Sequence, residues 1–225
     1  LKRMPRTGLA FLIGAAAIAG LPPLNGFVSE YFVFMGSFHG VASSSARLAV
    51  PLALSLAGLA LISGLAAACF AKAFGIVFLG EPRSEHAMHA HESGGLMAFP
   101  QLALAAACVA IGLLAPFMPH AMQPVVMLAC GLPAEALAQA FDTVLPGLQG
   151  ISFAFGGFFL LVGVLALLRM RLLAGRPVTE SGTWDCGYAA PAARMQYTAS
   201  SFAQPLVDMF HTVLRTRRTA HAPEG

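Results

Sequence analysis

A long stretch without charges constrains this chain most strongly. From Leu48 to Ala71 there is no Asp, Glu, Lys or Arg, and as a helix this stretch would be about 35 Å long, enough to cross the ~30 Å hydrocarbon core of a bilayer. Of the 225 residues, 57% are hydrophobic and 10% are charged, whereas a soluble domain carries about 25% charged residues. These values exclude a soluble globular protein and a disordered one, and they predict an integral membrane protein.

Further apolar segments predict an all-α, polytopic membrane helix bundle of about five transmembrane helices, one of which is broken by proline and glycine, followed by a polar tail. The predicted spans are residues 7–24, 26–43, 48–79, 96–118 and 148–170. The first two meet at a break formed by Pro22, Pro23, Asn25 and Gly26. Such a break is tolerated at membrane depth only inside a bundle or beside a wet cavity. We therefore expect a membrane domain over residues 1–173 and a cytoplasmic tail over 174–225.

The tail has an apolar pattern with helical spacing. Phe202, Leu206, Met209 and Val213 recur at intervals of three and four residues, which predicts an amphipathic helix lying on the membrane or on a partner. Five crossings would put the two ends of the chain on opposite sides of the membrane. The positive-inside rule then favours a cytoplasmic tail, because Arg83 and the seven arginines after residue 168 would lie inside. The basic residues before residue 8 would lie outside and oppose that preference.

Glu30 is the residue that points most directly to chemistry. An ionised carboxylate at membrane depth costs roughly 3 kcal/mol or more on insertion scales. Burial favours its neutral form, so that it can take up and release a proton near neutral pH. Glu30 also follows closely after the Pro22–Pro23 break. The alternative is that it lies near a helix end, reaches the interface and only caps the helix.

Two other titratable residues are candidates for the same pathway. Lys72 follows the charge-free run, and a buried lysine can lose its charge and relay protons; equally, it can extend to the lipid headgroups. His39 is either a proton exit group or an interfacial histidine. The cluster of His86, His89 and His91 lies in a short polar loop rich in acids, which favours a solvated loop over a metal site.

Motifs for bond-making chemistry are missing from the sequence. We find no phosphate-binding glycine loop, nucleophile elbow, dinucleotide fingerprint or haem-ligating histidine pair within one span. We therefore expect a conduit that is not catalytic by itself, with no metal and no cofactor in this chain, and with no nucleic-acid partner.

Three stretches near the start resemble a known superfamily. They are Lys2–Thr7, Phe11–Gly14 and Gly20–Glu30, and they look like late membrane helices of the proton-conducting, antiporter-like subunits of respiratory complex I, Mrp-type cation/proton antiporters and membrane-bound hydrogenases. Four more stretches narrow the resemblance to the family of hydrogenase-4 component B and the large membrane subunit of formate hydrogenlyase. These are Ala68–Gly80, Ser84–His91, Thr183–Tyr188 and Ala193–Leu206.

The resemblance implies roles for particular residues. Glu30 matches the terminal protonatable residue of the family's proton path, and Lys72 matches the lysine of the following long helix. It also implies a C-terminal fragment, because family members carry an earlier half with its own glutamate and lysine. The implied location is the bacterial inner membrane. The implied partners are protons, the lipid bilayer, and other membrane and peripheral subunits of a hydrogenase or complex I-like assembly. Docking of those subunits is expected at Trp184, Tyr188, Arg194 and Tyr197.

Three hypotheses for function remain open at this stage. The leading one is a proton-translocating membrane subunit of a [NiFe]-hydrogenase or formate hydrogenlyase-like complex, in which Glu30 exchanges a proton and Lys72 acts on it electrostatically. A second is a membrane anchor that docks the hydrogenase arm without moving ions. A third is a subunit of an Mrp-type Na⁺/H⁺ antiporter or of an NADH-quinone oxidoreductase.

Overall fold

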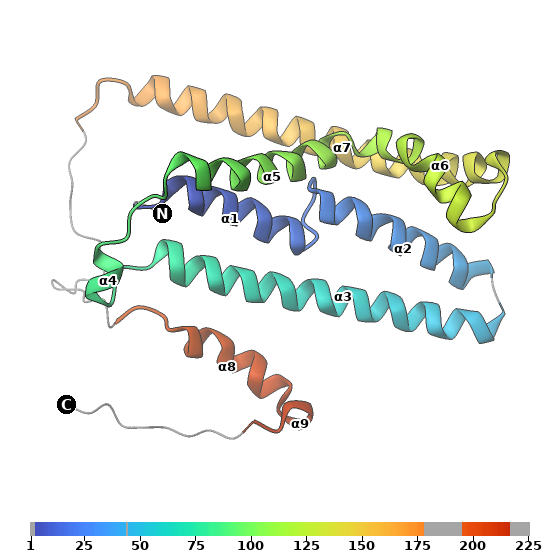
Figure 1. The fold of residues 1–225 in the computed structure, drawn as a ribbon, viewed down its shortest axis with the longest axis horizontal. Coiled ribbons are helices and arrows are strands. Elements are labelled where there is room, and N and C mark those ends of the chain that lie inside the picture. The colour runs from blue at the N-terminus through green and yellow to red at the C-terminus, as the bar shows by residue number, and fades with distance from the viewer. Residues whose placement is uncertain (1–2, 44, 178–194, 217–225) are drawn as a thin grey trace.

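The computed structural model describes residues 3–43, 45–177 and 195–216, and within them every regular element is a helix. In chain order these are α1 (Pro5–Ile18), α2 (Asn25–Ser43), α3 (Ala46–Phe74), the π-helical turn η1 (Gly75–Leu79), α4 (Glu85–Met88), α5 (Gly95–Leu113), the 3₁₀ turn η2 (Ala115–Phe117), α6 (Met118–Cys130), α7 (Ala134–Leu173), α8 (Ala199–Met209) and α9 (His211–Leu214). The long helices lie side by side as a bundle (Figure 1).

The predicted class, an all-α membrane helix bundle, is confirmed. In the part of the chain that the structure describes, three helical segments are long and apolar enough to cross a membrane, namely Ala46–Leu79, Gly95–Leu113 and Ala134–Leu173. The last is a single helix of 40 residues that continues through Pro146, so it begins earlier than the predicted span at 148–170. Large side chains such as Leu96 and Leu128 are 95% and 89% exposed, as expected for surfaces that face lipid or other protein.

The arrangement of the first two helices differs from the prediction of two separate crossings. In Figure 1, α1 and α2 lie end to end along one line, beside α3. With 14 residues, α1 is about 21 Å long, too short to cross the hydrocarbon core alone. The break between them therefore continues the direction of the chain, and α1 and α2 are the two halves of one discontinuous helix.

This arrangement also bears on the expectation that the start of the chain and the tail lie on opposite sides of the membrane. The Arg3 guanidinium donates to the carbonyl of Ala87 at 3.4 Å, and Arg83 donates to the carbonyls of Gln196 and Tyr197. The start of α1, the loop around α4 and the segment before α8 therefore share one end of the bundle. The expectation of opposite sides counted α1 and α2 as two crossings, which does not fit this arrangement of the described residues, because the Pro22–Pro23 break does not reverse the chain.

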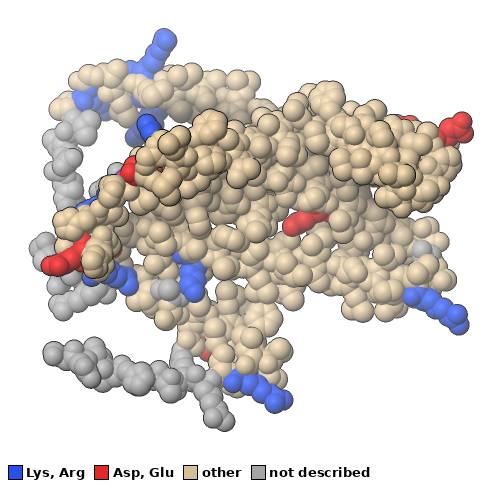
Figure 2. All heavy atoms as spheres, viewed as in Figure 1, with Lys and Arg blue, Asp and Glu red and all other residues tan. Residues whose placement is uncertain are grey.

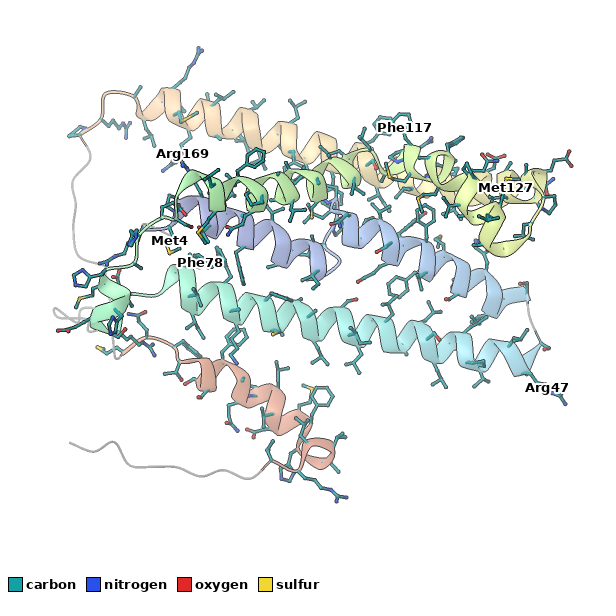
Figure 3. The ribbon with its side chains drawn as sticks, viewed as in Figure 1. Met4, Arg47, Phe78, Phe117, Met127 and Arg169 are labelled. Atoms are coloured by element: carbon teal, nitrogen blue, oxygen red, sulfur yellow. The ribbon has the colours of Figure 1, made fainter. Side chains whose placement is uncertain are left out.

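Charged side chains gather mainly at the two ends of the bundle (Figure 2). Figure 3 places Arg169 near Met4 at one end and Arg47 at the other. We call the end that holds Arg3, Arg83 and Arg169 the arginine-rich end. The division into a membrane domain and a tail after residue 173 stays a prediction, although α7 does end at Leu173.

The buried core lies where α2 meets η2 and α7. Val28, Ala115 and Leu148 form this core, with Tyr31 packed against it. The Tyr31 hydroxyl donates to the carbonyl of Val144 at 3.0 Å. One side of α2 is thereby held against α7, which leaves Glu30, on another side, to face α3.

Candidate functional site

The break between α1 and α2 has a well-defined backbone. Gly20 has a φ of +67°, in the left-handed region that glycine adopts without the steric cost of a Cβ. The amides of Gly20 and Leu21 donate to the carbonyls of Ala17 and Ala16 at 3.2 and 3.0 Å. Since Pro22 and Pro23 have no N–H to satisfy, the sequence ends α1 here with few amides left unpaired.

Close packing from both sides encloses the break. A Cβ on Gly112 of α5 would lie 1.6 Å from the carbonyl oxygen of Pro23, and a Cβ on Gly26 would lie 1.8 Å from that of Ala17. Both neighbours are backbone atoms, so only glycine permits these approaches. The Oδ1 atom of Asn25 is buried and accepts no hydrogen bond from a described residue. The break therefore lies inside the bundle, as its proline and glycine residues predict.

The carboxylate of Glu30 lies at this break. Side chains of a helix lean toward its N-terminus, so Glu30 reaches back from within α2 toward Gly20. A Cβ on Gly20 would lie 2.5 to 2.8 Å from the three atoms of the carboxylate group. On the α3 side, the Ser63 hydroxyl lies 3.0 Å from Glu30 Oε1. The carboxylate is thus half-buried between the break and α3.

Ser63 is a site residue that sequence reasoning missed. It is half-buried on α3, and its hydroxyl also donates to the carbonyl of Leu59 at 2.9 Å. The available signal was a polar side chain inside the charge-free run from Leu48 to Ala71. Serine is common in membrane helices, however, so only the packing of α2 against α3 distinguishes Ser63 from the other serines.

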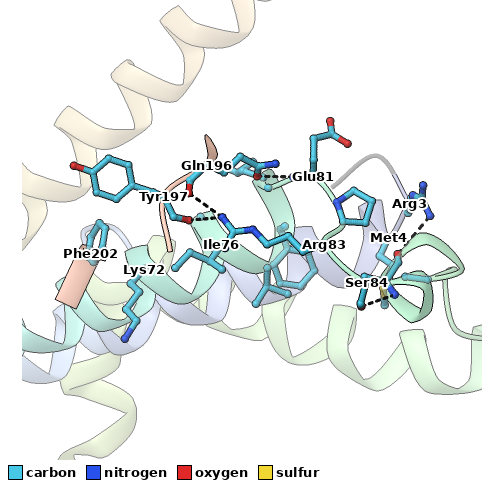
Figure 4. Close-up of a pocket in the computed structure, with 18 of the residues that line it drawn as sticks. Arg3, Met4, Lys72, Ile76, Glu81, Arg83, Ser84, Gln196, Tyr197 and Phe202 are labelled. Carbon is cyan, nitrogen blue, oxygen red and sulfur yellow. Dashed lines mark hydrogen bonds between the residues drawn. The ribbon is translucent and has the colours of Figure 1, made fainter. Parts of the chain in front are cut away.

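Lys72 does not contact this site. It lies nine residues after Ser63 on α3, which is about 13.5 Å along the axis and half a turn around it. Lys72 lines a cavity of about 980 Å³ at the arginine-rich end, whose walls include Arg3, Arg83 and Phe202 (Figure 4). No described residue forms a hydrogen bond or an ion pair with its amine. The structure therefore separates Lys72 from Glu30.

His39 is also distant from Glu30. It lies nine residues further along α2, again about 13.5 Å away along the axis. Its ring is exposed and makes a T-shaped contact with Phe38, with ring centroids 6.2 Å apart. His39 thus lies beyond the site on the side away from the arginine-rich end.

Of the predicted docking residues, Trp184, Tyr188 and Arg194 lie outside the described residues. Tyr197 is described, and its side chain is 75% exposed. Its carbonyl accepts a hydrogen bond from Arg83 Nη2 at 2.9 Å. The Gln196 side chain accepts the amide of Glu81 at 2.8 Å (Figure 4). The segment before α8 is therefore bound to the loop that follows η1.

A second carboxylate, Glu92, organises the start of α1. It accepts hydrogen bonds from the amides of Arg6 and Thr7 at 2.8 and 3.2 Å, and from the Thr7 hydroxyl at 2.5 Å. The Thr7 hydroxyl is the main cause that holds the pKa of Glu92 below its usual value, and the two amides and the Arg6 charge add to it. An anion at a helix N-terminus is also favoured by the helix dipole.

The polar loop around α4 is exposed, and the Nδ1 atom of His91 lies 3.1 Å from the carbonyl of His89. Among the described residues, no group of three or more His, Cys, Asp or Glu side chains lies close enough to hold a metal ion. Whether this chain carries a metal or a cofactor stays at the level of prediction.

The chain is similar in sequence to several known proteins. No protein-family model matches the chain. Its sequence is 35% identical to hydrogenase-4 component B of Escherichia coli strain K12 over 227 residues, covering 96% of this chain and 33% of that protein. It is 34% identical to formate hydrogenlyase subunit 3 of the same organism over 218 residues, covering 96% of this chain and 34% of that protein. The chain is a homologue of these two proteins.

The resemblance inferred from the sequence motifs is thereby confirmed. An uncharacterized protein of Mycobacterium tuberculosis strain H37Rv is also 35% identical over 226 residues, covering 95% of this chain and 34% of that protein. The chain spans about a third of the length of the curated relatives it matches.

Proposed function

We propose that this chain belongs to a proton-translocating membrane subunit of a hydrogenase-4 or formate hydrogenlyase-like complex. The observation that carries the proposal is the Glu30 carboxylate, enclosed at a helix break and hydrogen-bonded to Ser63 of the neighbouring helix. Acids held inside a membrane bundle are costly and mark proton pathways. The names of the homologues support a hydrogenase-type assembly.

In this proposal Glu30 takes up a proton from one side of the membrane and releases it toward the other. The break supplies the irregular backbone that is tolerated at membrane depth only where it is covered by protein or lines a wet path. Lys72 then acts at a distance, because two unit charges about 10 to 20 Å apart interact by roughly 1 to 2 kcal/mol at an effective dielectric constant of 20. The charge of Lys72 therefore affects how readily Glu30 binds a proton, although the two side chains are not in contact.

The arginine-rich end lies in the cytoplasm in this proposal, and the membrane is the bacterial inner membrane. Arg3 and Arg6 are hydrogen-bonded to the loop around α4, so they add to Arg83 and Arg169 at that end instead of opposing them. Arg47 lies at the other end (Figure 3). The positive-inside rule therefore favours a cytoplasmic tail more strongly than the sequence alone indicated.

The test replaces Glu30 in the full-length parent protein within its complex. In Glu30→Gln we expect hydrogen-dependent or formate-dependent electron transfer to continue while coupled proton movement into vesicles falls at least tenfold. Glu135→Gln is the matched control, because Glu135 is an exposed acid at the start of α7. Undiminished proton movement in Glu30→Gln would remove Glu30 from the pathway.

The second candidate is a membrane anchor that docks the peripheral arm without moving ions. The attachment of Gln196 and Tyr197 to Arg83 favours it, because it presents the start of the tail at one end of the bundle. Deletion of residues 195–225 separates the two functions. Loss of assembly, together with normal proton movement in Glu30→Gln, would support the anchor.

The redox partner also needs a direct test. We expect the tagged full-length protein to copurify with nickel and with hydrogen-dependent dye reduction, since the redox cofactors lie in other subunits in this proposal. Flavin with NADH oxidation would instead assign the chain to an NADH-quinone oxidoreductase. Absence of any redox partner, with sodium-dependent pH changes in vesicles, would assign it to an Mrp-type antiporter.

A further inference from the structure

The Ser63 hydroxyl lies between two acceptors. Its oxygen is 2.9 Å from the carbonyl oxygen of Leu59 and 3.0 Å from Glu30 Oε1. A hydroxyl group has one proton to donate and two lone pairs that accept. Ser63 therefore cannot donate fully to both oxygens at once, and its bonding depends on whether Glu30 carries a proton.

Ser63 can form a hydrogen bond with Glu30 in both protonation states of the carboxyl group. When Glu30 is ionised, Ser63 donates its proton to the carboxylate, which is a charge-assisted bond. When Glu30 is protonated, its O–H donates to the Ser63 oxygen, and Ser63 donates to the carbonyl of Leu59. Apart from the proton on Glu30, only the orientation of the Ser63 hydroxyl changes between the two states. Neither the Ser63 oxygen nor Glu30 Oε1 has to move.

Two other serines of the described helices, Ser55 and Ser43, lack this second partner. Ser55, two turns earlier on α3, donates to the carbonyl of Pro51 at 2.9 Å, and Ser43 of α2 donates to that of His39 at 2.7 Å. Both have the same bond to the carbonyl four residues earlier. Ser63 alone among these three faces a carboxylate, so its position cannot be explained by local helix bonding.

The opposite side of the carboxylate has no room to move. Gly20 lies so close to Glu30 that even a Cβ would overlap the carboxylate atoms, at 2.5 to 2.8 Å. We propose that Ser63 is a positioning residue that holds the Glu30 carboxyl group against Gly20 in both of its protonation states. This inference rests on the proposed role of Glu30 in proton movement.

The test uses the full-length complex and infrared difference spectroscopy of protonated carboxyl groups. The band lost in Glu30→Gln belongs to Glu30. In Ser63→Ala we expect this band to shift to higher frequency, because the carboxyl group loses a hydrogen bond, and coupled proton movement to fall about two- to tenfold. Ser63→Thr, which keeps a hydroxyl, should restore both, and Ser55→Ala should change neither.

Each result bears on the inference. An unshifted Glu30 band in Ser63→Ala overturns it, as does a Ser63→Thr variant that fails to restore the band while the complex assembles normally. A shifted band with unaltered proton movement in Glu30→Gln keeps the contact but overturns the proposed function. If no band disappears in Glu30→Gln, Glu30 does not change its protonation state and both ideas fail.

Discussion

The two best-defined carboxylates of this bundle, Glu30 and Glu92, are bound in contrasting ways. Glu92 accepts hydrogen bonds from the amides of Arg6 and Thr7 and from one hydroxyl. A backbone amide can only donate, so this arrangement suits the ionised carboxylate alone. Glu30 is bound instead by the hydroxyl of Ser63, which can donate or accept. The partners of Glu92 thus suit one protonation state of the carboxylate, whereas the partner of Glu30 suits both, as the proposed function requires.

The largest expected loss of stability comes from adding a side-chain atom where α5 packs against the break. In Gly112→Ala the new Cβ would lie 1.6 Å from the Pro23 carbonyl oxygen, so α5 must move away from the break. We expect a loss of about 3 kcal/mol or more in stability, measured as reduced assembly and a lower Tm of the purified complex. Gly156→Ala on α7 meets nothing within 4 Å and should behave like the parent. Equal Tm values for both variants would show that the break is not enclosed.

The next prediction compares two glycine variants, in order to distinguish the effect of backbone strain from the effect of contact with Glu30. Gly20 and Gly131 have similar φ values, +67° and +64°, but only Gly20 adjoins the Glu30 carboxylate. Alanine at either position should cost about 1 to 2 kcal/mol from the strained backbone. Proton movement per electron should fall only in Gly20→Ala. If both variants translocate protons normally, the position of the Glu30 carboxylate is not critical.

A third effect tests whether Glu92 acts as a fixed charge. Because its pKa in the folded protein lies below the usual value, Glu92 adds stability above the pKa of the unfolded chain, and this contribution is lost as the pH falls through the folded value. The Tm difference between the parent and Glu92→Gln should therefore be constant near neutral pH and shrink below about pH 4.5. A difference that grows on acidification would contradict this assignment.

The smallest effect concerns the segment that precedes α8. Arg83→Gln removes the guanidinium that donates to the carbonyls of Gln196 and Tyr197, at a cost of about 1 kcal/mol. We expect faster limited proteolysis near residues 195–198, while proton movement stays unchanged. Arg47→Gln, at the other end of the bundle, is the control. Identical proteolysis rates would show that Arg83 does not hold this segment.

Much of the fold could be predicted from the sequence. The charge-free run from Leu48 to Ala71 predicted α3, and Pro22–Pro23 predicted the break, because proline lacks the amide that a continuous helix needs. Glu30 was predicted as the candidate site because an acid in such apolar surroundings is costly. The motifs Gly20–Glu30 and Ala68–Gly80 also indicated the homologues that the comparisons found.

The direction of the chain across the break could not be predicted in this way. A proline-glycine break is compatible with both a turn and a continuing helix, and the choice depends on which helices pack beside it. Here Gly112 of α5 packs against Pro23, and α1 and α2 lie in line beside α3 (Figure 1). That packing places the first arginines at the arginine-rich end, whereas the sequence analysis had placed them on the opposite side of the membrane.

Composition and local pattern therefore determined that this is a membrane helix bundle with an acid at a helix break, because the cost of burying charge and the missing proline amide are properties of the chain itself. Tertiary structure alone decided which groups meet that acid. Ser63 and Gly20 lie on separate elements, and only the packing of α2 against α3 and the break brings both to Glu30. The same packing separates Lys72 from Glu30, since long-range contacts depend on how helices associate and leave no periodic signal in the sequence.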